Sequence, residues 1–349
     1  MDLNAVNSIL ENEGPLRKRQ AEFAIYKTRV RSWQDATSLP AELRQHLDMC
    51  CPVKFDAEIF RSDSDSSVKA ILRLKDGLKI ETVLLRHVGQ SSRNTVCVSS
   101  QAGCALNCAF CKTGSIDFKR NLSFNEIVQQ VLFFIYYLDD RDKVSQNVTN
   151  VVFMGMGEPL LNYSNVMEAV KIINDKEKIN IGSRRISIST SGIPEGIEKL
   201  AGEKLQLNIA VSLNASDNDT RSKLMPVNLK YPLEKLFPAI RYYIKKTSRR
   251  VMIEYVLMKG INDRPGDSEK LSALLKRELG MGGLYFVNLI PFNGDEVFLS
   301  PAPAEIKRFK YYLEKHGIKT TQRYRFGKNI SGACGQLVYQ SDGTCPNDY

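Results

Sequence analysis

Hydrophobic and polar residues show two different periodicities in the first part of the chain, one typical of helices and one typical of strands. Residues 3 to 50 carry apolar positions at helical spacing, with a break at Gly14-Pro15, and predict a small module of short helices. Residues 68–74 and 78–85 read as two strands, and the Asp76-Gly77 pair between them suits a type I′ turn. This part of the chain therefore predicts a helical module followed by a β-hairpin.

From residue 95 onward, short runs rich in β-branched residues alternate with longer amphipathic runs. The predicted strands are residues 96–99, 150–154, 185–189, 207–213, 251–257 and 284–290. The predicted helices are residues 125–138, 165–173, 194–200, 233–244 and 269–279. Strands that alternate with crossover helices form a parallel sheet. Six such units predict an α/β fold, a partial (β/α)6 barrel.

Polar or glycine-rich residues follow the predicted strands. They are Gly103-Cys104, Gly155 to Glu158, Thr190 to Gly192, Ser212 to Asn214 and Pro291 to Asn293. In a βα barrel, the loops at the carboxyl ends of the strands carry the chemistry. We therefore expect the functional site at this end of the barrel.

The charge balance favours a polyanionic partner. The chain has 49 Lys and Arg against 39 Asp and Glu, a net charge of +10, which suits a phosphate backbone; solubility alone is the other explanation. The longest apolar runs, such as residues 131–135, are too short to cross a bilayer, and the N-terminal residues lack a signal-peptide pattern. We therefore expect a cytoplasmic protein that does not bind membranes.

Three of the eight cysteines, Cys104, Cys108 and Cys111, form a CxxxCxxC loop directly after the first predicted barrel strand. Cysteines in a cytosolic chain point to metal or redox chemistry rather than to structural disulfides. Three thiolates can hold three irons of a [4Fe-4S] cluster and leave the fourth iron open. Zinc would need a fourth protein ligand, so buried or zinc-binding cysteines are the weaker alternative.

A CxxxCxxC loop at the first strand of a βα barrel resembles the radical S-adenosylmethionine superfamily. The resemblance implies that the open iron binds S-adenosylmethionine and that one-electron reduction cleaves it to a radical. The Gly155-Met156-Gly157-Glu158-Pro159 turn resembles the motif that contacts the cofactor's amino group. By the same resemblance, the cofactor contacts are Gly157, Glu158, Ser189, Ser212, Leu213, Asn214 and Asn293; ordinary turn and capping roles are the alternative for each taken singly.

A longer, ordered set of motifs resembles the RlmN/Cfr family of rRNA adenine methyltransferases. The set comprises residues 97–111, 155–162 (GMGEPLLN), 187–192 (SISTSG) and 333–337 (ACGQL), with further matches at 80–83 and 221–226 (RSKLMP). It implies methylation of an adenosine in 23S rRNA, perhaps also in tRNA. Residues 157–160 are closer to the carbon-2 branch than to the carbon-8 antibiotic-resistance branch.

The resemblance also implies three catalytic residues. Cys334 would accept a methyl group from one S-adenosylmethionine, and a second cofactor molecule would generate the radical that couples this carbon to adenine. Glu81 would then accept the ring proton, and Cys97 would resolve the protein–RNA adduct by forming a disulfide. Taken alone, Cys97 reads as a buried strand cysteine, and Glu81 reads as part of the polar face of a hairpin. Cys50, Cys51 and Cys345 match nothing in the family.

The resemblance divides the chain into four parts. They are an RNA-binding helical module (1–66), the hairpin with Glu81 (67–94), the barrel (95–326) and a C-terminal segment with Cys334 (327–349). Two positions depart from the family. Asn214 stands where histidine is usual, and residues 327–331 (GKNIS) stand where aspartates are usual.

Two other functional classes remain open from the sequence. A radical activase that acts on a protein would not need Cys97 or Cys334, and an iron–sulfur RNA-binding protein would not cleave S-adenosylmethionine. For the methyltransferase, the expected partners are rRNA, perhaps tRNA, and an external electron donor such as a flavodoxin-type protein.

Overall fold

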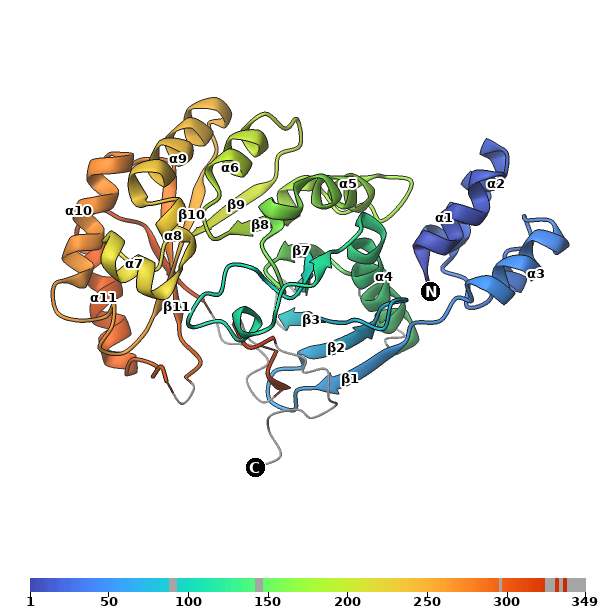
Figure 1. The fold of residues 1–349 in the computed structure, drawn as a ribbon, viewed down its shortest axis with the longest axis horizontal. Coiled ribbons are helices and arrows are strands. Elements are labelled where there is room, and N and C mark those ends of the chain that lie inside the picture. Colours follow the sequence, from blue (N-terminus) through green and yellow to red (C-terminus); the bar gives the residue numbers. More distant parts are fainter. Residues whose placement is uncertain (88–92, 142–146, 295–296, 324–329, 333–334, 338–349) are drawn as a thin grey trace.

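The computed structural model describes residues 1–349 except 88–92, 142–146, 295–296, 324–329, 333–334 and 338–349. The first helices form a module at one side of the molecule (Figure 1). They are α1 (Leu3–Glu11), α2 (Pro15–Phe23) and α3 (Ala41–Cys50), with a π turn at Ala24–Thr28. The predicted break is confirmed, because Pro15 occupies the first position of α2, where its missing N–H costs nothing. Buried Trp33 completes the module by donating its indole N–H to the carbonyl of Cys51.

A ten-stranded sheet organises the rest of the chain. Its strands, in sequence, are β1 (Ala57–Arg61), β2 (Val68–Arg73), β3 (Lys79–His87), β4 (Arg93–Cys97), β7 (Asn150–Phe153), β8 (Ile186–Thr190), β9 (Asn208–Ser212), β10 (Val251–Leu257), β11 (Tyr285–Pro291) and β12 (Thr320–Gln322). Strands β1 to β4 pair antiparallel, and every pairing from β4 to β12 is parallel. The predicted six-stranded barrel, β4 and β7 to β11, is therefore confirmed, with an antiparallel extension at one edge.

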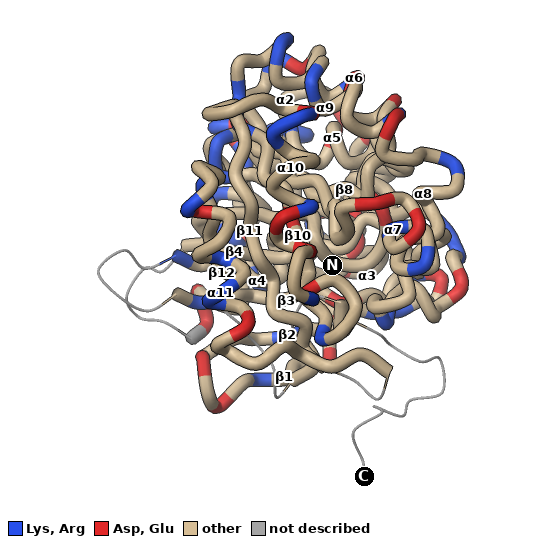
Figure 2. Tube along the Cα trace, turned by 90° about the vertical axis from the view of Figure 1, so that its left-hand side faces the viewer, with Lys and Arg blue, Asp and Glu red and all other residues tan. Residues whose placement is uncertain are grey.

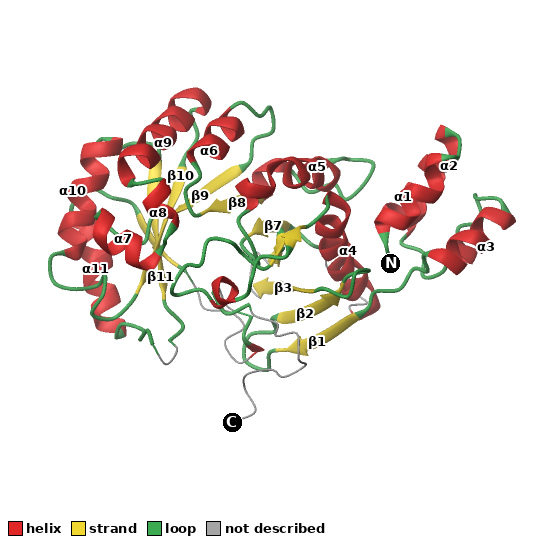
Figure 3. Cartoon of the chain, in the orientation of Figure 1, coloured by secondary structure: helices red, strands yellow, loops and turns green. Residues whose placement is uncertain are grey.

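Helices lie along the outer side of this curved sheet (Figure 3). The crossover helices are α4 (Phe124–Arg141), α5 (Tyr163–Asn174), α6 (Pro194–Ala201), α9 (Leu233–Thr247), α10 (Asp267–Leu279) and α11 (Pro303–Lys315). Short helices α7 (Asn218–Leu224) and α8 (Val227–Lys230) precede α9, and a small sheet pairs β5 (Gln101–Ala102) with β6 (Arg120–Asn121). The apolar stripes of the crossover helices bury the core against the sheet.

Two features of the hairpin region differ from the sequence prediction. β1, which falls in the range assigned to the helical module, pairs with β2, so the extension has three strands. The turn is not of type I′, because only Gly77 has positive φ (83°) and its N–H donates to the carbonyl of Leu74. Lys75 makes the loop one residue longer than a type I′ hairpin needs, which favours a type I turn closed by a left-handed glycine.

Side chains from neighbouring strands share one inner face of the barrel. The register places Cys97 beside Val83 of β3 and beside Val152 of β7. Further round, Ser212 of β9 pairs with Glu254 of β10. Because side chains alternate along each strand, the inner face is set by this register. Polar residues on this face therefore face one another across the barrel.

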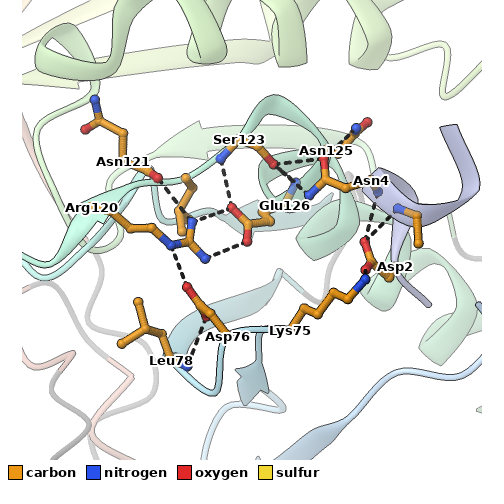
Figure 4. A network of polar contacts seen from close by, with 12 residues as sticks. Asp2, Asn4, Lys75, Asp76, Leu78, Arg120, Asn121, Ser123, Asn125 and Glu126 are labelled. Atoms are coloured by element: carbon orange, nitrogen blue, oxygen red, sulfur yellow. Dashed lines mark hydrogen bonds and ion pairs between the residues drawn. The ribbon is translucent and has the colours of Figure 1, made fainter. Parts of the chain in front are cut away.

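A polar network joins the helical module to the hairpin and to α4 (Figure 4). The Arg120 guanidinium donates to both carboxylate oxygens of Glu126, each at 2.8 Å, and to Asp76 at 2.7 Å. This hydrogen bond lowers the pKa of Asp76 below its ordinary value. Asn4 of α1 bonds to Asn125 at the start of α4. Three segments far apart in sequence are thereby held together.

Basic and acidic positions are interspersed along the trace in the view of Figure 2. No helix among the described residues is long and apolar enough to span a membrane.

α4 is fixed to the strand end that leads into the cysteine loop through Gln130. The Gln130 side chain is fully buried, accepts from the Ser99 N–H at 2.7 Å and donates to the Ser99 carbonyl at 2.9 Å. An amide side chain here completes both backbone hydrogen bonds of one residue at the point where β4 ends.

We predict that Gln130→Leu lowers the free energy of unfolding by about 2–4 kcal/mol, because two buried backbone groups lose their partners. Urea unfolding measures the change. Gln129→Leu, at the half-exposed neighbouring position, is the matched control and should leave stability nearly unchanged. Equal effects of the two substitutions would contradict this role of Gln130.

Candidate active site at the carboxyl ends of the barrel strands

The loop that carries the three cysteines is closed at its base by the β5–β6 pair. Gly103 has φ +79°, and a Cβ there would lie 2.2 Å from the carbonyl oxygen of Asp117, so a side chain does not fit where the two ends of the loop meet. Nearer the cysteines, the Ala109 N–H donates to the carbonyl of Leu224 at 2.9 Å. The loop is therefore fixed both at its base and against α7.

Cys104, Cys108 and Cys111 line one pocket at the carboxyl ends of the strands. Burial raises the pKa of Cys104 to about 12 and raises that of Cys108 as well. Iron binds the thiolate, so cluster binding would have to displace these protons. No three His, Cys, Asp or Glu side chains of the described residues converge as ligands of a single ion would. A four-iron cluster makes a different demand, one thiolate for each of three irons.

The donor set fits the predicted [4Fe-4S] cluster. Three soft thiols of one loop open into the same pocket. When bound there, the cluster supplies the electron that cleaves S-adenosylmethionine. Among the six described cysteines no disulfide is present.

The turn after β7 brings the predicted Gly157 and Glu158 to the pocket. Gly157 has φ +93°, and a Cβ would lie 2.4 Å from Cβ of Gln101. Glu158 is almost fully buried and accepts from the N–H groups of Ser191 at 2.7 Å and Leu160 at 3.1 Å. Burial raises the pKa of Glu158 above its ordinary value. This carboxylate therefore joins the loops that follow β7 and β8.

The other predicted cofactor contacts divide into pocket residues and supporting residues. Ser189, Ser212, Asn214 and Asn293 line the pocket, whereas the Leu213 side chain lies in the core. Asn214 has φ 58°, and its side-chain oxygen accepts from the N–H of Val256 at 2.9 Å. The amide of Asn214 thus supports β10 as well as facing the pocket.

The Arg221 side chain of α7 forms hydrogen bonds with both the loop after β8 and the loop after β9. It is fully buried and donates to the carbonyls of Ser191 at 2.7 Å, Leu213 at 3.1 Å and Ser212 at 3.2 Å. It also donates to the side chain of Asn228 at 2.8 Å. Burial lowers the pKa of Arg221 to about 10, so the guanidinium is still charged at neutral pH.

Sequence reasoning missed two charged residues of the pocket. Glu254 of β10 accepts from the Ser189 hydroxyl at 2.7 Å, and Arg323 lies 3.6 Å from its other carboxylate oxygen. Glu254 is almost fully buried. A carboxylate inside the otherwise apolar run 251–257 was the signal that could have identified it.

The predicted Glu81 and Cys97 lie on the inner face of the sheet, but neither lines the pocket that holds the three cysteines. Glu81 is two residues before Val83 on β3, and Val83 is the cross-strand neighbour of Cys97, so the three side chains share a face. Glu81 is fully buried and forms an ion pair at 3.0 Å with Lys69 of β2, which is also buried.

The described part of the C-terminal segment packs on the cysteine loop. The Lys112 N–H donates to the carbonyl of Gly335 at 2.8 Å, and the Thr113 hydroxyl donates to that of Leu337 at 2.6 Å. A Cβ on Gly332 would lie 3.5 Å from Val83. Cys334 lies outside the described residues. Gly332, two residues before it, lies close to Val83 on the inner face of β3, and Gly335, directly after it, accepts a hydrogen bond from the cysteine loop.

We predict that Cys108→Ala abolishes cluster assembly, because two thiolates cannot hold three irons. Iron and sulfide content and the visible absorption of the anaerobically reconstituted protein measure the loss. Cys50→Ala, at an exposed cysteine outside the pocket, is the control. Full cluster content in Cys108→Ala would rule out the assignment.

Removing the Arg221 side chain should affect both folding and the pocket. We expect Arg221→Met to lower the free energy of unfolding by about 3–5 kcal/mol, because several buried carbonyls lose their donor. Urea unfolding, with exposed Lys223→Met of the same helix as control, tests this role. A change equal to that of the control would show that the guanidinium does not hold these loops.

The comparisons with known proteins agree with one another. The family model of the Radical SAM superfamily matches residues 98–270. Proteins named probable dual-specificity RNA methyltransferase RlmN are similar to this chain. The relative from Dictyoglomus turgidum is 41% identical over 340 residues (96% of this chain, 94% of the relative), and that from Syntrophomonas wolfei is 42% identical over 345 residues (97% and 95%).

A solved structure matches the whole architecture. The crystal structure of a radical SAM methyltransferase from Sphaerobacter thermophilus superimposes with a TM-score of 0.87 at 39% identity and covers 97% of both chains. Identity of this extent over nearly the full length, together with the three-cysteine loop at the end of the first barrel strand, assigns the family. The chain belongs to the RlmN family of radical S-adenosylmethionine RNA methyltransferases.

Proposed function

We propose that this enzyme methylates carbon 2 of an adenosine in 23S rRNA, and also in tRNA, through a methyl group carried on Cys334. The observation that carries the proposal is the hydrogen bond between Lys112 and Gly335. It joins the residue after the third cysteine of the loop to the residue after Cys334, which supports one shared site for the methyl carrier and the radical source. The name of the relatives, probable dual-specificity RNA methyltransferase, supports the two RNA classes.

A radical route suits this substrate because carbon 2 of adenine is electron-poor and does not attack a methyl sulfonium directly. Each turnover uses two molecules of S-adenosylmethionine, one as methyl donor and one as radical source. Cys334 must be a thiolate to accept the methyl group. After the methyl carbon has bonded to adenine, a base must take the ring proton. The bond between this carbon and the sulfur of Cys334 must then be broken.

Glu81 and Cys97 are the residues we assign to those two tasks. Glu81 accepts the ring proton, and its ion pair with Lys69 supports this role because a base must be ionised before it acts. The adduct passes its unpaired electron to the external one-electron carrier. Cys97 then attacks the sulfur of Cys334 as a thiolate, the carbon–sulfur bond breaks, the released carbon takes up a proton to become the methyl group, and a disulfide remains. The buried thiol of Cys97 and the carboxylate of Glu81 lie on the same face of the sheet as Val83, and Gly332 lies close to Val83.

The remaining partners follow from this chemistry. The net charge of +10 favours an RNA partner, and RNA of the translation apparatus puts the enzyme in the cytoplasm. The helical module, helices α1 to α3, contributes to RNA binding. An external one-electron donor, such as a flavodoxin-type protein, reduces the cluster.

Expression in a bacterium that lacks its own adenine-carbon methyltransferases tests the proposal. rRNA and tRNA are purified separately, digested and analysed by mass spectrometry for methyladenosines. We expect 2-methyladenosine in both RNA classes with the unmodified chain and with Cys50→Ala, and none with Cys334→Ala.

Each other outcome has a defined meaning. 8-Methyladenosine would overturn the carbon-2 assignment, and methylation of one RNA class alone would overturn dual specificity. Retained methylation in Cys334→Ala would remove the methyl-cysteine route. No methyladenosine from a cluster-loaded protein would refute RNA methylation, and a radical activase would then be the next candidate.

A further inference from the structure

Glu254 is a buried carboxylate that lines the pocket. Neither the family motifs nor the proposed chemistry assigns it a role. One oxygen accepts from the Ser189 hydroxyl at 2.7 Å. The other makes no hydrogen bond within the described residues and has Arg323 at 3.6 Å as its nearest cation. A buried carboxylate oxygen that lacks a donor is costly unless a ligand supplies one.

The position of Glu254 along the sheet indicates which part of a ligand it meets. The cysteine loop follows β4 and the Gly157-Glu158 turn follows β7, so a ligand whose amino-acid end binds the cluster starts at that side. On the other side, the pocket reaches Pro291 to Asn293 at the end of β11 and Arg323 after β12. Glu254 on β10 and its partner Ser189 on β8 lie between these ends. S-adenosylmethionine laid across the pocket therefore presents its middle part, the ribose and the adjacent sulfonium, to Glu254.

We propose that Glu254 binds the two ribose hydroxyls of S-adenosylmethionine. Two adjacent hydroxyls offer two donors, and a carboxylate is an acceptor-only group that can take both, as acidic residues do with dinucleotide riboses. Ser189 orients the carboxylate by donating to one oxygen, and Ala210, opposite Ser189 in the register, leaves room for this bond across β9. The Arg323 guanidinium offsets the buried charge.

The sulfonium is the competing partner, because its positive charge would also attract a carboxylate. The two contacts differ in a measurable way. S-adenosylhomocysteine has the same ribose but an uncharged sulfur, and analogues of it that lack the 2′- or 3′-hydroxyl keep everything except one donor. Comparison of these ligands separates a hydrogen bond to the ribose from an attraction to the sulfonium.

The test is the dissociation constant of S-adenosylmethionine, S-adenosylhomocysteine and its 2′-deoxy and 3′-deoxy analogues for the cluster-loaded full chain, measured anaerobically by calorimetry. We expect Glu254→Ala to weaken the first two ligands alike, by about 10- to 100-fold, the range for hydrogen bonds to a charged group. The unmodified protein should discriminate against the deoxy analogues, and Glu254→Ala should lose this discrimination. Asn288→Ala, at the position paired with Glu254 on β11 but outside the pocket, is the matched control.

A loss confined to S-adenosylmethionine would assign Glu254 to the sulfonium and overturn the proposal. Equal discrimination against the deoxy analogues with and without the carboxylate would overturn it too. If Glu254→Ala does not fold, the unmodified protein must still discriminate against the deoxy analogues, and Glu254→Gln provides the second variant. The inference rests on S-adenosylmethionine binding and not on the RNA reaction. The role of Glu254 and the proposed RNA methylation can therefore be tested separately, and either can fail without the other.

Discussion

The pocket depends on one buried guanidinium. Arg221 donates to backbone carbonyls from the loops after β8 and β9, and no carboxylate among the described residues pairs with it. Each loop alone would leave carbonyl dipoles buried without donors, which costs more than a typical net hydrogen bond contributes. A single planar group with five N–H donors satisfies them together. The loops that carry Ser191 and Ser212 are therefore fixed before any ligand is present.

The strand register determines what these fixed loops surround. A parallel sheet that closes on itself gives each strand one side toward the helices and one side toward the interior. Here the helix-facing side is apolar, while the interior side carries Ser189 and Glu254, with Glu81 on the antiparallel extension. Buried carboxylates are tolerated because each has a partner: Glu81 has Lys69, Glu158 has backbone N–H groups and Glu254 has Ser189 and Arg323.

Sequence patterns predicted the barrel strands to within three residues at each end, because each of these strands is an apolar run between turn residues. They missed β1 and β12, whose short, half-exposed strands lack a clear alternation. The three-cysteine loop could be predicted because its chemistry is local in sequence. The ion pair between Lys69 and Glu81 and the pair between Glu254 and Ser189 could not, since each depends on register and on the closing of the sheet rather than on spacing along the chain.

The hydrogen bond between Thr113 and Leu337 joins residues 224 positions apart in the chain. Closing so long a loop has a high entropic cost until the elements between its ends have folded. The barrel can therefore assemble first, and the segment with Leu337 docks on the cysteine loop afterwards. In this order of folding, iron and sulfide can reach the three thiols while the cysteine loop is still uncovered. Docking of the segment with Leu337 then ends this access.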